Sequence, residues 1–246
     1  MQNKTDVLQN CTIEGNVVFL PEGQLDRKLY VEVAKTLEIL GGKWNKREKG
    51  FLFEENPAEL LDSAIQGTPI NAKKEYQFFP TPKELAYRLV ALAEIEAGMT
   101  ILEPSAGRGS IIEALLDKAK HSIWAYELMP LNFAYLQRKY DNKVILGQGD
   151  FLDNALLFDR IVANPPFSKN RDIKHIRKMY ESLVEGGKLV SICSTHYLNC
   201  DNREEKEFRK FLSDTNAVVT PVEVGAFKAS GTLIPTVIIE IWKHSI

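Results

Sequence analysis

The stretch Met99-Thr-Ile-Leu-Glu-Pro-Ser-Ala-Gly-Arg-Gly109 predicts a strand that runs into a glycine-rich turn, and residues 110–120 then predict a helix. Such a turn lets a ligand approach the backbone closely and presents amide donors at the start of the helix. It lacks the spacing of a dinucleotide fingerprint and the Lys-Ser/Thr pair of a phosphate-binding loop. An acid, Glu103, ends the strand instead, which favours a ligand with an ammonium group over one with a pyrophosphate.

Three more strands are predicted downstream, at residues 123–127, 143–146 and 160–163. Glu127 ends the first of these strands, where a carboxylate is placed to accept from both hydroxyls of a ribose. Asp150 follows the second strand and is placed to accept from an adenine amine, with Phe151 beside the ring. Ligands of open α/β sheets bind along the carboxyl edge of the strands. The pattern therefore predicts an α/β, Rossmann-like sheet with helices on both faces and a ligand site at that edge.

The last of these strands leads into Asn164-Pro-Pro-Phe167, a chemically unusual turn. Asn164 supplies a side-chain carbonyl, Pro165 has no N–H to donate and Pro166 has a fixed φ, so carbonyl oxygens project from a rigid turn. Phe167 adds a flat apolar face. Two acceptors beside an aromatic ring suit a planar amine such as N6 of adenine, whose lone pair is delocalised into its ring. An Asx turn at the end of a strand is the structural alternative.

Upstream, Tyr76-Gln-Phe-Phe-Pro-Thr-Pro82 leads into an amphipathic run at residues 84–96, which predicts a helix. Thr81-Pro-Lys-Glu84 matches a capping box with proline at the first helical position. Helix capping leaves the aromatic pair Phe78-Phe79 unexplained. Phe79 and Thr81 resemble the Phe-x-Thr-Pro element that precedes the cofactor half of the amino-methylating DNA methyltransferases. In that family the element lies against the methionine end of S-adenosylmethionine.

Residues 76–246 as a whole resemble a class I S-adenosylmethionine-dependent methyltransferase of the amino-methylating, Asn-Pro-Pro-Phe type. The resemblance implies S-adenosylmethionine as the cofactor. It assigns cofactor contacts to Phe79, Thr81, Glu103, Ser105, Gly107, Gly109, Glu127, Leu128, Asp150, Phe151 and Asn164. It assigns the catalytic loop to Asn164, Pro165, Pro166 and Phe167, and substrate contacts to Phe167 and Phe227.

The carboxyl-terminal part is expected to hold a helix at residues 172–185 and strands at residues 188–193, 216–224 and 235–242. The helix is predicted to be closed by Gly186-Gly187. The last two strands match the closing strand pair of the family, and the loop between them contains Phe227. In the family this loop often carries an aromatic residue that sandwiches the target base. Packing of Phe227 on the edge of the sheet is the alternative.

Composition describes an ordinary globular protein, with 246 residues of which 44% are hydrophobic and 26% are charged. The formal net charge of −2 creates no overall field that would draw the protein onto nucleic acid, so such a contact requires a local patch. No run approaches the roughly 18 apolar residues that span a bilayer. We expect a cytoplasmic protein without a membrane partner. Three cysteines without a C-x-x-C pair and four scattered histidines favour reduced thiols and no metal site.

Residues 1–74 predict a small α+β accessory module, separate from the large domain at residues 75–246. Within the module, Lys43-Trp-Asn45 and Phe51-Leu-Phe53 flank a polar turn that ends at Gly50, which predicts a hairpin. Its lysines and arginine are suited to a phosphate backbone, and Trp44 is suited to stacking on a base. The alternative is that Trp44 packs in a small core while the charged residues are merely solvated.

The expected function is transfer of a methyl group from S-adenosylmethionine to the N6 amine of adenine in DNA. RNA guanine-N2 and protein-glutamine methylation remain as alternatives, because those enzymes share Asn-Pro-Pro-Phe or Asn-Pro-Pro-Tyr. A non-catalytic cofactor-binding subunit is an alternative of another class. Long family members carry a recognition domain after the last strand, whereas this sequence ends at Ile246. We therefore expect target recognition to come from the module, which resembles segments of phage and prophage methylases, or from a partner or second subunit.

Overall fold

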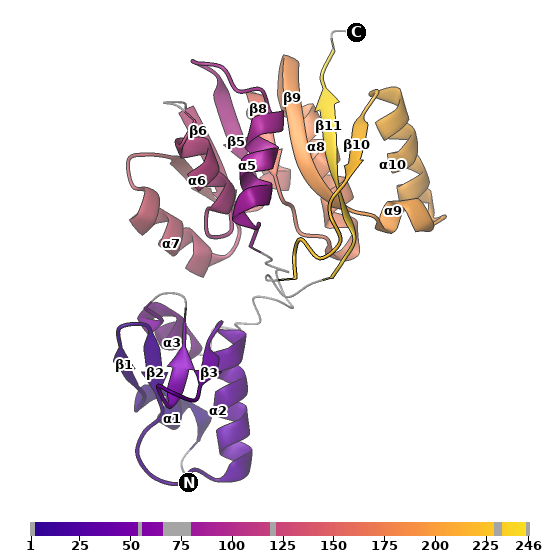
Figure 1. The fold of residues 1–246 in the computed structure, drawn as a ribbon. Helices are drawn as coiled ribbons and strands as arrows, with labels where there is room; N and C mark the ends of the chain where they lie inside the picture. The colour runs from indigo at the N-terminus through magenta and orange to yellow at the C-terminus, as the bar shows by residue number, and fades with distance from the viewer. Residues whose placement is uncertain (1–2, 54–55, 66–79, 119–121, 229–232, 245–246) are drawn as a thin grey trace. The chain divides into compact units, whose positions relative to one another are not determined.

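The computed structural model describes residues 3–53, 56–65, 80–118, 122–228 and 233–244. The chain divides into two compact units, residues 1–77 and residues 78–246, and each is described by itself (Figure 1). The predicted boundary after residue 74 falls among residues outside the described ranges.

The large unit is built on a seven-stranded sheet with the order β10-β11-β9-β8-β5-β6-β7. Strands β5 to β9 pair in parallel, whereas β11 pairs antiparallel with both β9 and β10. The strands are β5 (Thr100–Glu103), β6 (Ser122–Glu127), β7 (Ile145–Gln148), β8 (Phe158–Ala163), β9 (Leu183–Ser194), β10 (Val218–Pro221) and β11 (Thr236–Trp242). This mixed sheet confirms the predicted Rossmann-like α/β fold.

Helices cover both faces of the sheet (Figure 1). One face packs against α5 (Lys83–Leu92), α6 (Ser110–Leu116) and α7 (Pro130–Tyr140), and the other against α8 (Arg171–Glu181) and α10 (Arg203–Asp214). Adjacent strand residues divide between two cores, with Ile101 on the α5 face and Leu102 on the α8 face. This alternation follows from the two-residue period of a strand. Short segments complete the unit: η1 (Phe151–Asp153), η2 (Ser168–Asn170) and α9 (His196–Asn199).

Two predicted helix ends are wrong. The helix expected to reach residue 96 stops at Leu92, and Glu94 adopts a positive φ of 50°. The helix expected at residues 172–185 ends at Glu181, and β9 starts two residues later. Gly186 and Gly187 therefore interrupt a strand rather than close a helix. Gly186 has a φ of 73°, and its N–H donates to the carbonyl of Lys243 at 2.8 Å, so strand pairing overrides the local helix-stop signal.

The small unit contains a four-stranded antiparallel sheet with the order β1-β2-β4-β3. Its elements are α1 (Lys4–Gln9), β1 (Thr12–Glu14), β2 (Val17–Phe19), α2 (Arg27–Ile39), β3 (Lys43–Asn45), β4 (Gly50–Leu52) and α3 (Ala58–Ile65). Helices and sheet enclose a core of their own, to which Val18, Leu37, Phe51 and Leu61 contribute. The small unit thus has a hydrophobic core of its own.

The β3–β4 hairpin presents its basic turn to solvent. Lys46, Arg47 and Lys49 are exposed, and the side chain of Asn45 accepts from the N–H of Arg47 at 2.9 Å to form the turn. Trp44 remains 44% exposed, while its ring meets the ring of Phe51 edge-on at 5.2 Å between centroids. The tryptophan therefore packs on the small core and also offers an exposed surface.

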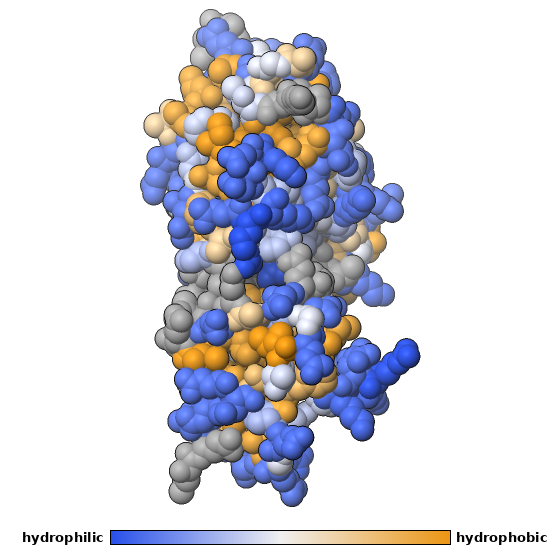
Figure 2. All heavy atoms as spheres, turned by 90° about the vertical axis from the view of Figure 1, so that its left-hand side faces the viewer, coloured by the Kyte–Doolittle hydropathy of each residue, from blue (hydrophilic) through white to orange (hydrophobic). Residues whose placement is uncertain are grey.

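Hydrophilic side chains are spread over both units on the face drawn in Figure 2, with smaller hydrophobic groups between them. Within the described ranges, no helix combines the length and the apolar character that crossing a membrane requires. At one edge of the large sheet, β10 exposes Val218 and Val219.

Candidate functional site

The first two acids predicted for the site lie at the ends of neighbouring parallel strands. Glu103 ends β5 and pairs in register with Ala125 of β6, which itself ends at Glu127. The two oxygens of Glu127 accept from the backbone N–H of Gly107 at 2.6 Å and of Met129 at 2.7 Å. The glycine-rich turn and the second acid therefore hold each other in place.

Burial gives both carboxyl groups unusual acidities. Burial raises the pKa of Glu127 to about 7, against the opposing effect of the backbone N–H groups of Met129 and Gly107. The pKa of Glu103 is raised well above its usual range, mainly by burial and to a smaller extent by the neighbouring Glu127. Glu103 Oε2 is buried and has no hydrogen-bond partner among the described residues. Two crowded, desolvated acids of this kind favour a ligand that brings a cation and hydroxyl donors.

Gly109 is required by the geometry of the turn. It caps α6 with a φ of 85°, and a Cβ at this position would lie 2.5 Å from the ring of Tyr140. The hydroxyl of Tyr140 donates to the carbonyl of Gly109 at 3.1 Å. In the same turn, Ser105 Oγ lies 3.4 Å from Nδ1 of His175 on α8. The turn is thus fixed by α7 on one side of the sheet and reached by α8 from the other.

Asp150 follows β7 and is held by groups that the sequence did not indicate. One carboxylate oxygen accepts from the N–H of Leu152 at 3.1 Å, and the other pairs with Arg171 at 2.6 Å. The adjacent Phe151 is buried, with its ring 5.8 Å from that of His175. Burial lowers the pKa of His175 to about 4, so this histidine is neutral. Arg171 and His175 belong to α8, which follows the Asn-Pro-Pro-Phe loop and η2. No local sequence pattern predicts that they contact Asp150 and Phe151.

The Asn-Pro-Pro-Phe loop follows β8 and is tied to the stretch before α5. Asn164 Nδ2 donates to Thr81 Oγ1 at 3.0 Å, across 83 positions of sequence. The predicted capping box is wrong, because Pro82 is the N-cap of α5 and no side chain caps that helix. Thr81 uses its hydroxyl to orient the amide of Asn164 instead. That bond fixes the direction of the Asn164 carbonyl oxygen, the group expected to meet an amine.

Comparisons with known proteins agree on the architecture. No family model matches the chain. Ribosomal RNA small subunit methyltransferase A of Hydrogenobaculum sp. (strain Y04AAS1) is 28% identical over 121 residues, which cover 45% of this chain and 48% of that protein. The chain therefore matches about half the length of this curated relative.

Two solved structures extend the likeness over most of the chain. A Listeria monocytogenes protein assigned as a class I S-adenosylmethionine-dependent methyltransferase matches with a TM-score of 0.56 and 13% identity, over 89% of this chain and 74% of that one. A modification subunit assigned to a type I restriction enzyme of Vibrio vulnificus YJ016 matches with a TM-score of 0.55 and 15% identity, over 90% and 54%. The large unit has the class I methyltransferase fold.

In this class I methyltransferase fold, the ends of β5, β6, β7 and β8 bring the predicted acids and Asn164 to one edge of the sheet. Leu128 is 40% exposed directly after Glu127. Phe167 and Phe227 meet edge to face, with centroids 6.4 Å apart, and both are buried. The two predicted substrate residues are thus brought together. Phe79, predicted as a cofactor contact, lies outside the described residues.

Sequence reasoning missed a buried acid beside this edge. Asp172, at the start of α8, is 1% exposed and accepts from the hydroxyl of Ser194 at 2.7 Å and from its N–H at 3.0 Å. These bonds fasten α8 to the end of β9. Acids are common in the first turn of a helix, so the sequence alone does not single out Asp172. Its bonds to Ser194 become visible only when the fold places α8 beside β9.

Proposed function

We propose that this protein binds S-adenosylmethionine and transfers its methyl group to the exocyclic N6 amine of adenine in DNA. The observation that carries the proposal is the amide of Asn164, held by Thr81 at the same sheet edge as the buried acids Glu103 and Glu127. When bound, S-adenosylmethionine supplies a methyl group made electrophilic by its sulfonium.

The acids would hold the cofactor. Glu103 Oε2 is available to accept from the ammonium of the methionine portion. Each oxygen of Glu127 accepts one backbone N–H and keeps a second lone pair for a ribose hydroxyl. The positive φ values of Gly107 and Gly109 shape the turn on which the cofactor would rest. A cation next to Glu103 also relieves the repulsion between the two carboxylates.

The loop after β8 would act on the acceptor. The carbonyl oxygens of Asn164 and Pro165 would accept from the two N–H bonds of an aromatic amine and draw its nitrogen towards a tetrahedral form that can attack. Positioning and polarisation carry most of this work, because the methyl group is already electrophilic. His175 is the neutral, buried histidine near the turn, and it is assigned to packing against Phe151 and Ser105 rather than to proton transfer.

A nucleic-acid substrate requires the target base to reach this loop. A flipped base costs a few kcal/mol, which stacking on Phe167 or Phe227 offsets. Because these rings contact each other edge to face, we expect one of them to turn when a base enters. RNA is the second candidate acceptor, and the sequence match to a ribosomal RNA methyltransferase favours it.

Acceptor identification tests the proposal. The protein is incubated with radiolabelled S-adenosylmethionine and, in parallel, with adenine-unmethylated DNA, ribosomal RNA or protein, and each product is digested and its labelled component identified. We expect labelled N6-methyladenine from DNA, and no label with Asn164→Ala. Label confined to RNA would establish the second candidate. Cofactor binding by calorimetry without label in any acceptor would indicate a non-catalytic subunit.

A further inference from the structure

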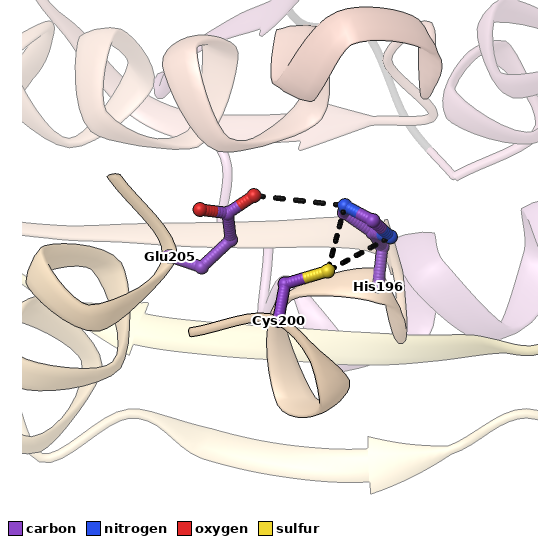
Figure 3. Close-up of side chains that lie close together, drawn as sticks. All are labelled: His196, Cys200 and Glu205. Carbon is purple, nitrogen blue, oxygen red and sulfur yellow. Dashed lines mark hydrogen bonds and ion pairs between the residues drawn. The ribbon is translucent and has the colours of Figure 1, made fainter. Parts of the chain in front are cut away.

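His196, Cys200 and Glu205 gather beyond the end of β9, outside the site described above (Figure 3). Cys200 Sγ lies 3.2 Å from Nε2 of His196, and the same nitrogen lies 3.5 Å from Oε1 of Glu205. The nearest ligand atoms of all three residues lie within 4.8 Å of one another. Three different ligand types therefore converge on one point.

We propose that this cluster binds a zinc ion. Thiolate, imidazole and carboxylate are ligands that Zn²⁺ accepts together, with bonds of about 2.0 to 2.3 Å in a tetrahedron. Those bond lengths place neighbouring ligand atoms about 3.3 to 3.6 Å apart. The two distances from His196 Nε2 are already close to this range. Cys200 Sγ also lies 3.6 Å from Nδ1, so the imidazole must turn to direct Nε2 at the ion while Cys200 and Glu205 approach each other. Water would take the fourth position.

Glu205 contributes a buried carboxylate to the cluster, and its Oε1 accepts from Asn170 Nδ2 at 2.9 Å and from Asn202 Nδ2 at 3.5 Å. Its side chain is 1% exposed, and Oε2 has no hydrogen-bond partner among the described residues. Within the described part of the chain, its one ion-pair partner is His196, a side chain that is 56% exposed. The carboxylate therefore keeps acceptor capacity for a cation in addition to its hydrogen bonds. Figure 3 shows this carboxylate directed at the His196 ring.

The backbone preorganises the cluster. His196 starts the single-turn helix α9 and Cys200 caps its end, so the spacing of four residues places both on one side of the turn. Arg209 of α10 donates to the carbonyl of Cys200 at 2.7 Å and also to the carbonyl of Tyr197. Glu205 belongs to the first turn of α10. The partly exposed His196 and Cys200 leave an entry path for an ion.

Asn170 connects the cluster to the loop after β8. It lies three residues beyond Phe167, has a φ of 57°, and donates from Nδ2 to both Glu204 and Glu205 at 2.9 Å. A zinc ion on Glu205 would fix the acceptor on which Asn170 depends. Through Glu205 and Asn170, the ion would thus connect α10 to the segment that follows Asn-Pro-Pro-Phe. Metal binding itself does not rest on the proposed methyl transfer.

Metal titration of tag-free protein, stripped with a chelator and kept reduced by a phosphine, tests the proposal. We expect calorimetry to show one Zn²⁺ per chain, and Co²⁺ to give the absorption of a tetrahedral site with a thiolate charge-transfer band. Cys200→Ser should abolish that band and weaken Zn²⁺ binding at least about tenfold, the range seen when support of a metal ligand is removed. His196→Gln and Glu205→Gln should weaken binding similarly. Cys11→Ser, at another partly exposed cysteine, is the matched control and should change nothing.

Melting curves guard against variants that fail to fold. Zn²⁺ should raise the melting temperature of the wild-type protein and of Cys11→Ser, but not that of a folded Cys200→Ser. Wild-type protein that binds Zn²⁺ no better than Cys200→Ser, or a Co²⁺ complex without a thiolate band, would overturn the proposal. The three residues would then form only an ion pair and a hydrogen bond.

Discussion

The acid-lined side of the site, Glu103 with Glu127 and the turn at residues 104–109, differs in kind from the amide side, Thr81 with the loop at residues 164–167. On the acid-lined side, burial raises the pKa of both carboxyl groups, and backbone N–H groups hold the carboxyl of Glu127. On the amide side, a neutral side chain is held by a neutral hydroxyl. The two sides therefore suit different partners, a charged cofactor and an uncharged amine.

This difference teaches how one sheet edge divides its work. In the proposed function, the carboxylates of Glu103 and Glu127 would meet a cation and hydroxyl donors, and the desolvated groups would gain strong partners. In the proposed function, the neutral acceptors Asn164 and Pro165 would meet the amine and polarise it without adding a charge. Substitutions on the two sides should consequently affect different measurements.

Asn164→Ala should give the largest effect, and it should fall on turnover alone. Removing one oriented polar group that meets the reacting atoms costs about 2.7–4 kcal/mol, or roughly 10²–10³ in kcat. Cofactor affinity should stay within a few-fold, since the acid-lined side is unchanged. Single-turnover rates and calorimetry measure the two quantities separately. A variant that keeps most of its turnover would remove Asn164 from the reaction.

Glu127→Gln should do the reverse and weaken cofactor binding, by about 1.5–3 kcal/mol for each charged hydrogen bond removed. Because the pKa of Glu127 in the free protein is about 7, wild-type affinity should increase as the pH is raised through that value, by up to about tenfold per pH unit. Glu103, whose pKa is also raised, stays in the variant, so the difference between the two pH profiles reports Glu127. Equal pH profiles in calorimetry would place Glu127 outside the cofactor site.

The same shift predicts the stability of the cofactor-free protein. A carboxyl group whose folded pKa lies above the usual 4.5 favours folding when protonated, so its contribution is complete below 4.5 and disappears as the pH rises through about 7. The free energy of unfolding of the wild type, compared with Glu127→Gln, should fall by about 3 kcal/mol across that window. Urea denaturation at several pH values measures it. A constant difference would contradict the raised pKa.

The turn of the β3–β4 hairpin offers the exposed basic side chains Lys46, Arg47 and Lys49. If it meets a phosphate backbone, Lys46→Ala, Arg47→Ala and Lys49→Ala combined should weaken DNA binding equally across sequences. The log–log salt slope should flatten by up to about 0.9 for each phosphate that the variant no longer neutralises. Trp44→Ala should remove about 1–3 kcal/mol more if the ring stacks on a base. An unchanged salt slope in the triple variant would assign the module another role.

Thr81→Val should give the smallest effect and sharpen the comparison most. Removal of the hydrogen bond to Asn164 should cost about 0.5–1.5 kcal/mol, a few-fold to about tenfold in kcat, with little change in cofactor affinity. Thr81→Ser keeps the hydroxyl and is the matched control. A fall in melting temperature without a fall in kcat would show that Thr81 serves the fold and not the amide.

Contiguous signals in the sequence predicted much of this molecule. Each of these signals consists of adjacent residues: the strands that end in Glu103 and Glu127, and the loop that begins at Asn164. The observed sheet confirms the fold that they indicate. Contacts between distant residues were not predictable. The bond from Asn164 to Thr81 and the ion pair of Asp150 with Arg171 exist only once the strand order brings those elements together.

Some predictions from local sequence failed because contacts between distant residues decide the structure there. Gly186-Gly187 resembles a helix stop, but pairing of Leu183 with Phe158 of β8 draws this segment into the strand. The expectation of no metal site, against which the zinc proposal stands, rested on the absence of a C-x-x-C pair. The spacing of His196 and Cys200 across one turn was the available signal, and it gains meaning only when α10 places Glu205 beside them.

The position of β11 makes the docking of β10 depend on a strand that follows it in the chain. In the described sheet, β10 pairs with β11 and with no other strand, yet it precedes β11 in the chain. Until β11 emerges, the apolar edge of β9 and the exposed Val218 and Val219 of β10 have no native neighbour. Unpaired apolar edges recruit other chains. Any state of the chain in which β11 has not yet docked therefore exposes these two apolar edges to other chains and to chaperones.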